Sequence, residues 1–407
     1  MNATEQPGIL DGVRVLDFTA MMSGPYCTRL MADLGAEVIK VEPPEGDHIR
    51  MRPPVRDGRS AYLAQLNAGK KSLALDLKKP AAVNLVNELV ARCDVVIENF
   101  RPGVMKRLGF DYASLSQLNP KLVYCSISGF GQQGSWSGRS AYAPVLHAAS
   151  GYDMANLDYQ EGDAKRPLKN GIFVADVLGG SLAFGAIQAA LFRAARTGLG
   201  DCVDLSLLDA MLGLLVYECQ EAQFPAERRR PLYRPTRAKD GFLLIAPVSQ
   251  NNFEALARAV GHPEWISDER FAVIGKREHH WSELMGLLDE WAGTRSAEDC
   301  EASLNSAGVP CSRYFTVRET MQLPPIAERG VLQTVDDGAG PTQVPNPAFR
   351  FKKSAAHARE KVPSLGEHGP QLLSELLGLS EETIARLRRD KALFVAEAGN
   401  AGATRTK

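Results

Sequence analysis

The sequence lacks the features that mark several large classes of protein. Lys plus Arg (47) nearly equal Asp plus Glu (48), so no net charge would gather nucleic acid. The seven cysteines form no CxxC pair and the seven histidines no HExxH spacing, so we expect reduced thiols in a cytoplasmic protein and no metal site. No basic-then-apolar signal pattern opens the chain. The uncharged, Ala- and Gly-rich stretch from Val177 to Phe192 is shorter than the ~20 residues of a membrane span, so we expect a buried helix and no membrane attachment.

What is present indicates a folded enzyme-sized chain. Hydrophobic residues make up 44% and charged residues 23% of the 407 residues, which is the balance of an ordered protein. A chain of this length exceeds one ordinary hydrophobic core, so we expect two domains or one domain with a large insertion.

The first third of the chain alternates short β-branched runs with helical patterns, which predicts an α/β fold with a mainly parallel sheet. Gly12 to Phe18 predicts a strand, Pro25 begins a helix that ends at Gly35, and Ala36 to Glu42 predicts the next strand of a βαβ unit. Further strands are predicted at Ser72–Leu77, Asp94–Glu98, Leu122–Ile127 and Val203–Ser206, and helices at Ala81–Arg92, Val177–Thr197 and Leu207–Gln223.

The character of the sequence changes after Phe224. The next residues, PAERRRPLYRPTRAKDG, mix proline with arginines and are typical of a linker or lid. A smaller α/β segment is predicted from Gly241 to Ile326, and an extended region from Val331 to Phe351 precedes a helical tail.

Asp176 stands just before the long apolar pattern, in VADVLGGSLAFG. Its position favours an N-cap whose carboxylate accepts the first free N–H groups of a helix. A second interpretation is a nucleophile: an Asp has a reference pKa of ~3.9, a helix N-terminus favours its charged form, and Gly179 and Gly180 leave room for a large substrate. The two roles are compatible, since a capping carboxylate can also attack a carbonyl.

Two further segments are candidates for ligand contact. In the segment Leu16 to Glu42 a loop between a strand and a helix offers backbone N–H groups to an anion, although the absence of GxGxxG weakens a dinucleotide interpretation. In the segment Val95 to Gly109 a strand ends at Asn99 and Phe100 and leads into a short basic helix. Either segment on its own is equally typical of an ordinary turn.

Together these segments resemble the family III CoA-transferases. Four stretches carry the resemblance, in the family's order along nearly the whole chain: VLDFTAMMSGPYCTRLMADLGAEVIKVE, NAGKKSLALDLKKP with CDVVIENFRPG, VADVLGG with GLGDCVDLSLLDAML, and PSLGEHGPQLLSELLG. The resemblance implies transfer of coenzyme A from an acyl-CoA to a free carboxylic acid, with CoA thioesters as substrates and no tightly bound cofactor. It also implies that Asp176 is the nucleophile, which forms a mixed anhydride and then an aspartyl-CoA thioester.

The resemblance extends to individual site residues. Positions that match the family's CoA contacts are Leu75, Lys78, Asn99, Phe100 and Arg107, of which the two basic side chains suit phosphate and the Phe ring an apolar face. Tyr142 matches an active-site tyrosine whose hydroxyl would stabilise a developing oxyanion. The loop Ala20 to Ser23 aligns with the family's active-site loop after the first strand, so Met22 and Ser23 are expected among the residues that bind the CoA substrate.

The sequence also departs from the formyl-CoA:oxalate pattern. Ala20 and Met22 replace a His and a Gln, and Pro43, Ser140 and Ala143 replace an Arg, a Lys and a Glu, so oxalate is not implied as the acceptor. The Gly-rich lid is absent, and arginines stand in its region instead. One hypothesis is that the cluster Arg228 to Arg237 binds a second carboxylate on a dicarboxylic substrate; a solvated linker would have the same composition.

Three other functions remain open at this stage. The same superfamily contains α-methylacyl-CoA racemases, which use a His at the position of Tyr142; His147 is close in sequence but fits a structural role, and Tyr is a poor base at neutral pH. An intramolecular CoA transfer within one dicarboxyl-CoA is a further alternative. A CoA-binding scaffold without chemistry would not need Asp176.

The resemblance also implies the layout of the molecule. A large Rossmann-like domain would comprise residues 1–223 and, after the return of the chain, residues 331–407, with a small domain at 224–330. Family members form dimers of interlocked chains, so a homodimer is expected here.

Overall fold

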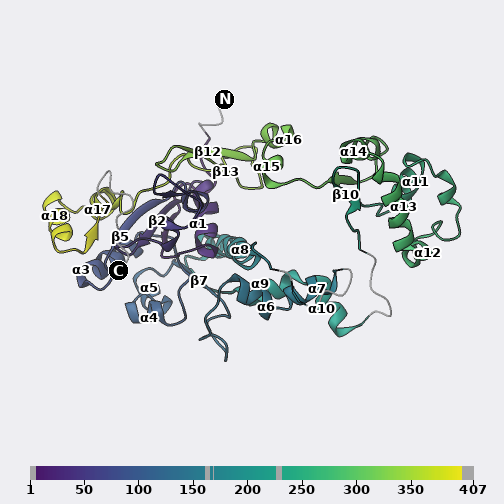
Figure 1. The fold of residues 1–407 in the computed structure, drawn as a ribbon. Coiled ribbons are helices and arrows are strands. Elements are labelled where there is room, and N and C mark those ends of the chain that lie inside the picture. Colours follow the sequence, from purple (N-terminus) through teal and green to yellow (C-terminus); the bar gives the residue numbers. More distant parts are fainter. Residues whose placement is uncertain (1–5, 161–165, 168, 226–231, 397–407) are drawn as a thin grey trace. The chain divides into compact units, whose positions relative to one another are not determined.

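The computed structural model describes residues 6–160, 166–167, 169–225 and 232–396 (Figure 1). The chain divides into two compact units, one formed by residues 1–219 with 327–407 and the other by residues 220–326. The boundaries predicted from the sequence, at 224 and 330, lie a few residues beyond these. Each unit has its own hydrophobic core.

The large unit is built on a seven-stranded sheet, which confirms the predicted α/β class. The strand order is β14-β5-β2-β1-β6-β7-β8, and every pair is parallel except β14 with β5. The apolar character of the strands follows from their burial on both faces of the sheet. Their bounds are β1 Arg14–Asp17, β2 Glu37–Glu42, β5 Lys71–Leu75, β6 Val95–Glu98, β7 Val123–Ser128, β8 Cys202–Ser206 and β14 Leu393–Phe394. The antiparallel edge strand β14 was not predicted, because two residues give no pattern.

Alternate residues of the strands enter two separate cores. Val15 packs on one face of the sheet with residues of α1, α6 and α8, and Leu16 packs on the other with residues of α3, α5, α17 and α18. The helices of this unit are α1 Ser23–Asp33, η1 His48–Met51, α2 Ala61–Asn67, α3 Pro80–Val90, α4 Val104–Leu108, α5 Tyr112–Leu118, α6 Ala143–Ala149, α7 Tyr152–Asp158, α8 Val174–Thr197, α9 Leu207–Leu214, α17 Gly369–Leu377 and α18 Glu381–Arg389. Short hairpins β3 Val55–Arg56 with β4 Arg59–Ser60 and β12 Leu332–Asp336 with β13 Pro341–Pro345 complete it.

Two glycines allow helix α8 to pack closely, Gly180 against α1 and Gly179 against the start of α9. A Cβ at Gly180 would lie 2.5 Å from the carbonyl oxygen of Ser23, and a Cβ at Gly179 would lie 2.1 Å from the side chain of Leu207. The glycines therefore permit close helix packing, whereas the sequence had suggested that they make room for substrate. The helix has 24 residues, longer than the predicted uncharged stretch, and by length and composition alone it could cross a membrane.

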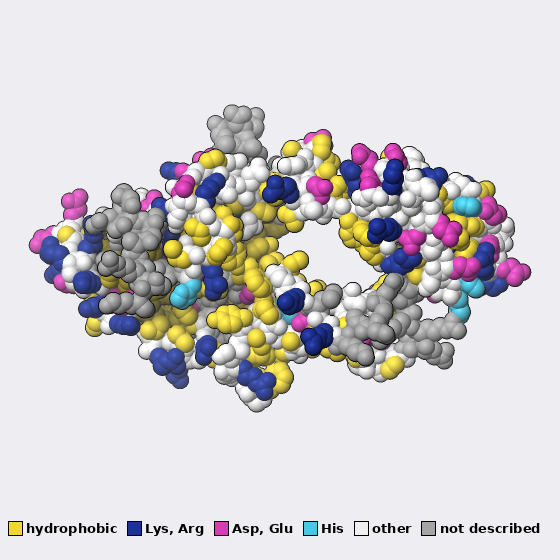
Figure 2. Space-filling model, in the orientation of Figure 1, with side chains coloured by type: hydrophobic (Ala, Val, Ile, Leu, Met, Phe, Trp, Pro, Cys, Tyr) yellow, Lys and Arg dark blue, Asp and Glu magenta, His cyan; other side chains and the backbone are white. Residues whose placement is uncertain are grey.

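The described part of the chain leaves the outer face of α8 uncovered. Only 33% of its most apolar window is buried, so the expectation of a buried helix holds for one face alone. Leu182 is 47% exposed and Phe192 is 64% exposed. Figure 2 shows hydrophobic side chains gathered on the large unit, over the region where Figure 1 places α8 and α9.

The small unit combines a three-stranded antiparallel sheet with helices. Its strands are β9 Thr236–Arg237, β10 Phe242–Ile245 and β11 Cys311–Arg313, in the order β11-β10-β9. Its helices are α11 Gln250–Ala259, η2 Pro263–Ile266, α12 Ile274–His279, α13 Trp281–Gly293, α14 Ala297–Ser306 and α15 Val317–Thr320. Two helices, α10 Val216–Gln223 and α16 Pro324–Glu328, lie at the unit boundaries. The helix predicted over Leu207–Gln223 is therefore wrong in one respect: it breaks at Leu215 into α9 and α10.

Candidate active site

The candidate site lies where the strand order of the large sheet reverses. From β1 the chain proceeds outward through β2 to β5, and it then returns to β6 on the other side of β1. In open parallel sheets, ligands bind outside the carboxyl ends of the two strands that flank such a point. The loops after Asp17 of β1 and after Glu98 of β6 accordingly line a cavity of about 830 Å³. Its remaining walls come from η1, α2, the segment after β7, and the first turns of α6 and α8.

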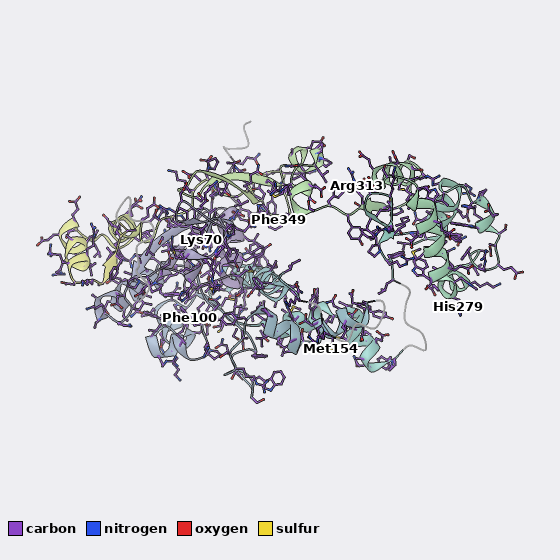
Figure 3. All side chains as sticks on the ribbon, viewed as in Figure 1. Lys70, Phe100, Met154, His279, Arg313 and Phe349 are labelled. Carbon is purple, nitrogen blue, oxygen red and sulfur yellow. The ribbon has the colours of Figure 1, made fainter. Side chains whose placement is uncertain are left out.

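Two buried ion pairs hold the loop after β1 in place. Lys40 donates from Nζ to the carbonyl oxygen of Thr19 at 2.7 Å and to Asp47 at 3.0 Å, and Asp47 accepts the N–H of Met21 at 3.3 Å. Lys70, labelled in Figure 3, pairs in the same way with Asp17 at 3.1 Å. Burial lowers the pKa of Lys70 to about 8, and the Asp17 carboxylate opposes this shift. These charges fix a loop in which Met21 adopts a left-handed φ of 67°.

Asn99 joins the two loops across the reversal point. Its side-chain oxygen accepts the N–H of Ala20 at 2.9 Å, and its Nδ2 donates to the Ala20 carbonyl at 2.8 Å. The same Nδ2 lies 3.4 Å from the Oγ of Ser23. The sequence had suggested an amide or ribose contact for Asn99, but the structure uses most of this amide to hold the loop in place.

Asp176 lies in the first turn of α8 and faces the cavity. Burial raises its pKa to about 6, and a hydrogen bond from the Ser23 side chain opposes that rise. Because the Ser23 oxygen accepts from Asn99, its own proton is free to point to Asp176, which completes a hydrogen-bonded chain of three side chains. Asp176 therefore remains mainly ionised at neutral pH while being only half solvated.

The expected N-cap role of Asp176 is wrong. The N-cap of α8 is Phe173, which makes no side-chain capping bond, and Asp176 is the third residue of the helix. The backbone N–H of Ala175 is accepted instead by Nε2 of His147 at 3.2 Å. Asp176 consequently accepts no capping bond from its own helix and faces the cavity with Ser23 as its side-chain donor, while its position in the first turn still suits a negative charge.

Backbone N–H groups beside Asp176 are available to an anion. Met22, Ser23 and Gly24 stand at the start of α1, and Met22 as N-cap makes no side-chain capping bond. Among the described residues no acceptor takes their N–H groups, in contrast to those of Ala20 and Met21, which are bound by Asn99 and Asp47. The helix start therefore supplies donors for charge that develops on a carbonyl oxygen or a thiolate.

Besides Ser23, the hydroxyl groups of Tyr142, Tyr62 and Ser128 belong to residues that line the cavity. Tyr142, the N-cap residue of α6, is 70% exposed and lies on the wall as the sequence predicted. Tyr62 had no motif that would have identified it, and the sequence analysis did not single out Ser128. Burial, with the charge of Asp176, raises the pKa of Tyr62 to about 12, which keeps its proton in place. The buried Oγ of Ser128 has no partner in the described part of the chain, so it is free to bind a substrate atom.

The structure brings together most of the predicted site residues, but not all. Those that line the cavity are Met22, Ser23, Asn99, Phe100, Tyr142 and Asp176, of which Phe100 is labelled in Figure 3. Leu75, Lys78 and Arg107 are not part of its lining. Leu75 is fully buried in the core, so its side chain cannot contact a ligand. Lys78 and Arg107 are exposed; Lys78 follows the carboxyl end of β5, and Arg107 lies in α4, which follows β6.

The sequence did not identify three arginines of the cavity wall. Arg52, Arg101 and Arg139 line it, and Asp176 is the only acidic side chain among its described lining residues. The cluster predicted to bind carboxylate, Arg228 to Arg237, lies partly outside the described residues, at 226–231. Its described members belong to the small unit, where Arg234 pairs with Asp289 at 2.6 Å and Arg237 lies over the ring of Phe242.

No metal centre competes with this site in the described ranges. Within residues 6–160, 166–167, 169–225 and 232–396, no group of three or more His, Cys, Asp or Glu side chains is placed to hold a metal ion.

Comparison with known proteins gives this arrangement a family. CoA-transferase family III matches residues 10–369, so the chain belongs to that family. The chain is 32% identical to the succinyl-CoA–D-citramalate CoA-transferase of Chloroflexus aurantiacus over 97% of this chain and all of that one. It is 35% identical to the acetyl-CoA:oxalate CoA-transferase of Acetobacter aceti, over 90% of this chain and 96% of that one. A CAIB/BAIF family crystal structure from Brucella suis, 33% identical, covers 91% of this chain and all of its own, with a TM-score of 0.79. The chain is therefore an enzyme of the CoA-transferase type.

Proposed function

We propose that this enzyme transfers coenzyme A from an acyl-CoA to a free carboxylic acid, with Asp176 as a covalent nucleophile. The observation that supports this most strongly is the setting of Asp176. It is the only acid among the described residues of the cavity wall, it is hydrogen-bonded by Ser23, and it lies beside uncommitted N–H groups at the start of α1. A carboxylate with a pKa of about 6 is ionised at neutral pH yet more basic than an ordinary Asp.

The steps balance without any other reagent. An oxygen of Asp176 attacks the thioester carbon, the C–S bond breaks, and CoA leaves as a thiolate from a mixed anhydride. The thiolate attacks the aspartyl carbonyl and releases the donor acid, giving an aspartyl-CoA thioester. An acceptor carboxylate then attacks that carbonyl and again expels the thiolate, which attacks the acceptor's own carbonyl and regenerates Asp176. The N–H groups of Met22, Ser23 and Gly24 would stabilise the negative charge in each attack.

Short dicarboxylates are the substrates that we propose. Relatives over nearly the whole chain are named for succinyl-CoA with D-citramalate and, in Agrobacterium fabrum at 34% identity, for succinate with glutarate. Each of these names pairs two short dicarboxylic acids, and in the first of them one acid is already bound to CoA through one of its two carboxyl groups. An intramolecular transfer between the two ends of one dicarboxyl-CoA would use the same steps.

A racemase is less well supported by the site. It would need a second acid or base opposite Asp176. His147 is buried and uses Nε2 to bind the backbone of Ala175, so it is not available as that base. Tyr142 occupies the position that the racemases give to His.

Trapping with hydroxylamine tests the proposal. Incubation of the enzyme with succinyl-CoA and hydroxylamine should inactivate it and leave a hydroxamate on Asp176, found by peptide mass spectrometry. A heavy-oxygen acceptor acid should transfer one labelled oxygen to the same residue. The Asp176→Ala variant is the matched control and should acquire neither mark. Transfer without any mark on Asp176 would overturn the covalent route, and exchange of the α-hydrogen with deuterated water without transfer would favour the racemase.

We also propose that two copies associate in the cytoplasm through the outer face of α8. Exposed apolar side chains on that face include Leu182 and Phe192, and contiguous apolar surface of this kind marks an interface. All seven cysteines are unpaired, as a reducing compartment would keep them.

A further inference from the structure

Arg52 has no acceptor of its own, although it stands in an arginine-rich segment whose other members do. Arg50 donates to Glu42, Arg56 to Asp337, and Arg59 to Ser364. Within the described residues the guanidinium of Arg52 makes no hydrogen bond or ion pair. It lines the cavity that contains Asp176.

The backbone at Arg52 is nevertheless held firmly. Its N–H donates to the carbonyl of Ile49 at 3.1 Å, and its carbonyl accepts the Oγ–H of Ser60 at 2.6 Å. Ser60 is buried and is the N-cap of α2, where it accepts the N–H of Leu63 at 3.2 Å. The chain thus presents an unpaired cation at the cavity wall from a backbone position that is held in place on both sides.

The same contacts place Arg52 beside Tyr62. Tyr62 follows Ser60 in the first turn of α2 and lines the cavity as well. Its hydroxyl lies within the fields of both Asp176, which raises its pKa, and Arg52, which lowers it, while burial is the largest influence and keeps it protonated. Asp176, Tyr62 and Arg52 therefore border one space, with an anion at one end and a cation at the other.

Arg52 lies on the other side of the reversal point from the basic residues near β6. Phe100 and Arg101 follow β6, and Arg107 comes soon after in α4, whereas Arg52 follows η1 on the β2 side of β1. If the coenzyme portion of the substrate occupies the β6 side, the acyl chain bound at Asp176 extends toward Tyr62 and Arg52.

We propose that Arg52 binds the distal carboxylate of a short aliphatic dicarboxylic substrate, with the Tyr62 hydroxyl as an additional donor, and so determines selectivity for diacids over monoacids. The inference rests on the proposed CoA transfer, and it assigns to Arg52 the role that the sequence had suggested for the cluster Arg228 to Arg237. A guanidinium suits this task because its planar fork can donate two parallel hydrogen bonds to one carboxylate.

Selectivity between matched acids tests the inference. The rate constant kcat/KM is measured for glutarate and for valerate as acceptors, each with succinyl-CoA and with butyryl-CoA as donor. In Arg52→Met, we expect the glutarate-to-valerate ratio with butyryl-CoA to fall about 10- to 100-fold, the effect of losing a hydrogen bond to a charged group. The KM for glutarate should carry most of the change, and Arg52→Lys should restore part of the ratio.

Arg139→Met is the matched control. Arg139 lines the same cavity and lies over the ring of Trp136, and its loss should leave the ratio unchanged whatever it does to the overall rate. An Arg52→Met enzyme that transfers CoA with an unaltered ratio overturns the role of Arg52 alone. A wild-type enzyme that transfers CoA to none of these acids, from either donor, overturns the proposed function instead.

Discussion

The Nε2 atom of His147 accepts the backbone N–H of Ala175 at 3.2 Å, one residue before Asp176. His147 belongs to α6 and is only 1% exposed, with its ring 5.3 Å from that of Tyr152. An acceptor nitrogen cannot carry a proton, so the neutral ring holds its hydrogen on Nδ1. A histidine thus caps the helix that carries the proposed nucleophile, and α6 determines where α8 begins.

Replacing His147 with Leu should destabilise the protein and slow the reaction. The lost bond to Ala175 should lower the free energy of unfolding by about 1–2 kcal/mol. Burial lowers the pKa of His147, so its neutral form is favoured by folding and its contribution is present above its ordinary pKa and lost as the pH falls below it. Denaturant unfolding at several pH values should therefore show that the free energies of unfolding of wild type and variant differ less at acidic pH than at neutral pH. An equal difference at every pH would contradict the capping role.

Replacing Asp176 with Asn should abolish transfer and raise stability. Its folded pKa of about 6 lies above the ordinary value of 3.8, so the stability it contributes is present at low pH and lost as the pH rises through about 6. At neutral pH the ionised side chain is therefore unfavourable for folding, and its neutral isostere should raise the free energy of unfolding by about 1–3 kcal/mol. Thermal and denaturant unfolding at neutral pH provide the measurement. A clear loss of stability would show that the carboxylate supports the fold.

Replacing Ser23 with Ala should shift the acid limb of the pH profile. The Ser23 hydrogen bond lowers the pKa of Asp176, so its removal should move the fall in kcat/KM, expected near pH 6 in the wild type, to higher pH. Ser137→Ala is the control, because Ser137 lines the same cavity but donates to the Gly134 carbonyl. Identical profiles for wild type and Ser23→Ala would remove this serine from the site chemistry.

Replacing Lys40 with Met should be strongly destabilising. Lys40 and Asp47 are both buried and pair at 3.0 Å, and removal of one partner from such a pair costs about 3–5 kcal/mol because the other charge remains buried. The double variant Lys40→Met with Asp47→Leu should recover much of that stability while kcat stays low, since neither replacement can hold Thr19 and Met21. A double variant no more stable than Lys40→Met would show that the two charges are not coupled.

Replacing Leu182 with Glu should prevent the proposed homodimer from assembling as the chains fold. The new charge falls on the outer face of α8, and light scattering after gel filtration should report a monomer in place of the wild-type dimer. Leu118→Glu is a matched control, since Leu118 is 49% exposed, close to the 47% of Leu182, but belongs to α5 on the opposite face of the sheet. A wild-type protein that is already monomeric would refute the interface, and flotation with lipid vesicles would show that α8 meets a membrane instead.

The sheet could be predicted from the sequence because its strands are buried on both faces. Runs such as those of β6 and β7 are apolar almost throughout, and the turn residues between them limit where each strand can end. The break in the helix at Leu215 could not be seen, since no Pro marks it and a single Gly such as Gly213 is tolerated inside a helix. The edge strand β14 depends on a long-range pairing with Leu75 that short-range patterns do not contain.

Site residues that stand next to a predicted strand end or helix start could be predicted from the sequence, whereas residues that only the fold brings to the cavity were missed. Asp176, Ser23 and Asn99 stand beside recognisable strand ends or helix starts. Arg52 has ordinary sequence neighbours and gains its meaning only from the cavity that it shares with Asp176. Ser128 was missed although it directly follows the predicted strand Leu122–Ile127, a position that could have identified it. The cap on α8 was misassigned for a related reason: the acceptor comes from a residue far along the chain, and spacing alone favoured the nearest carboxylate.

The contact of Gly180 with the carbonyl of Ser23 has an evolutionary consequence. Any side chain larger than that of Gly180 would push α1 away from α8. The distance between Asp176 and the Ser23 hydroxyl that donates to it therefore cannot change without loss of activity. Arg52 and Arg139 are bound by no such constraint, since both lie on exposed segments of the cavity wall. The enzyme can therefore come to accept new acid substrates through substitutions at the cavity rim, whereas the close packing of α1 against α8 has to be kept.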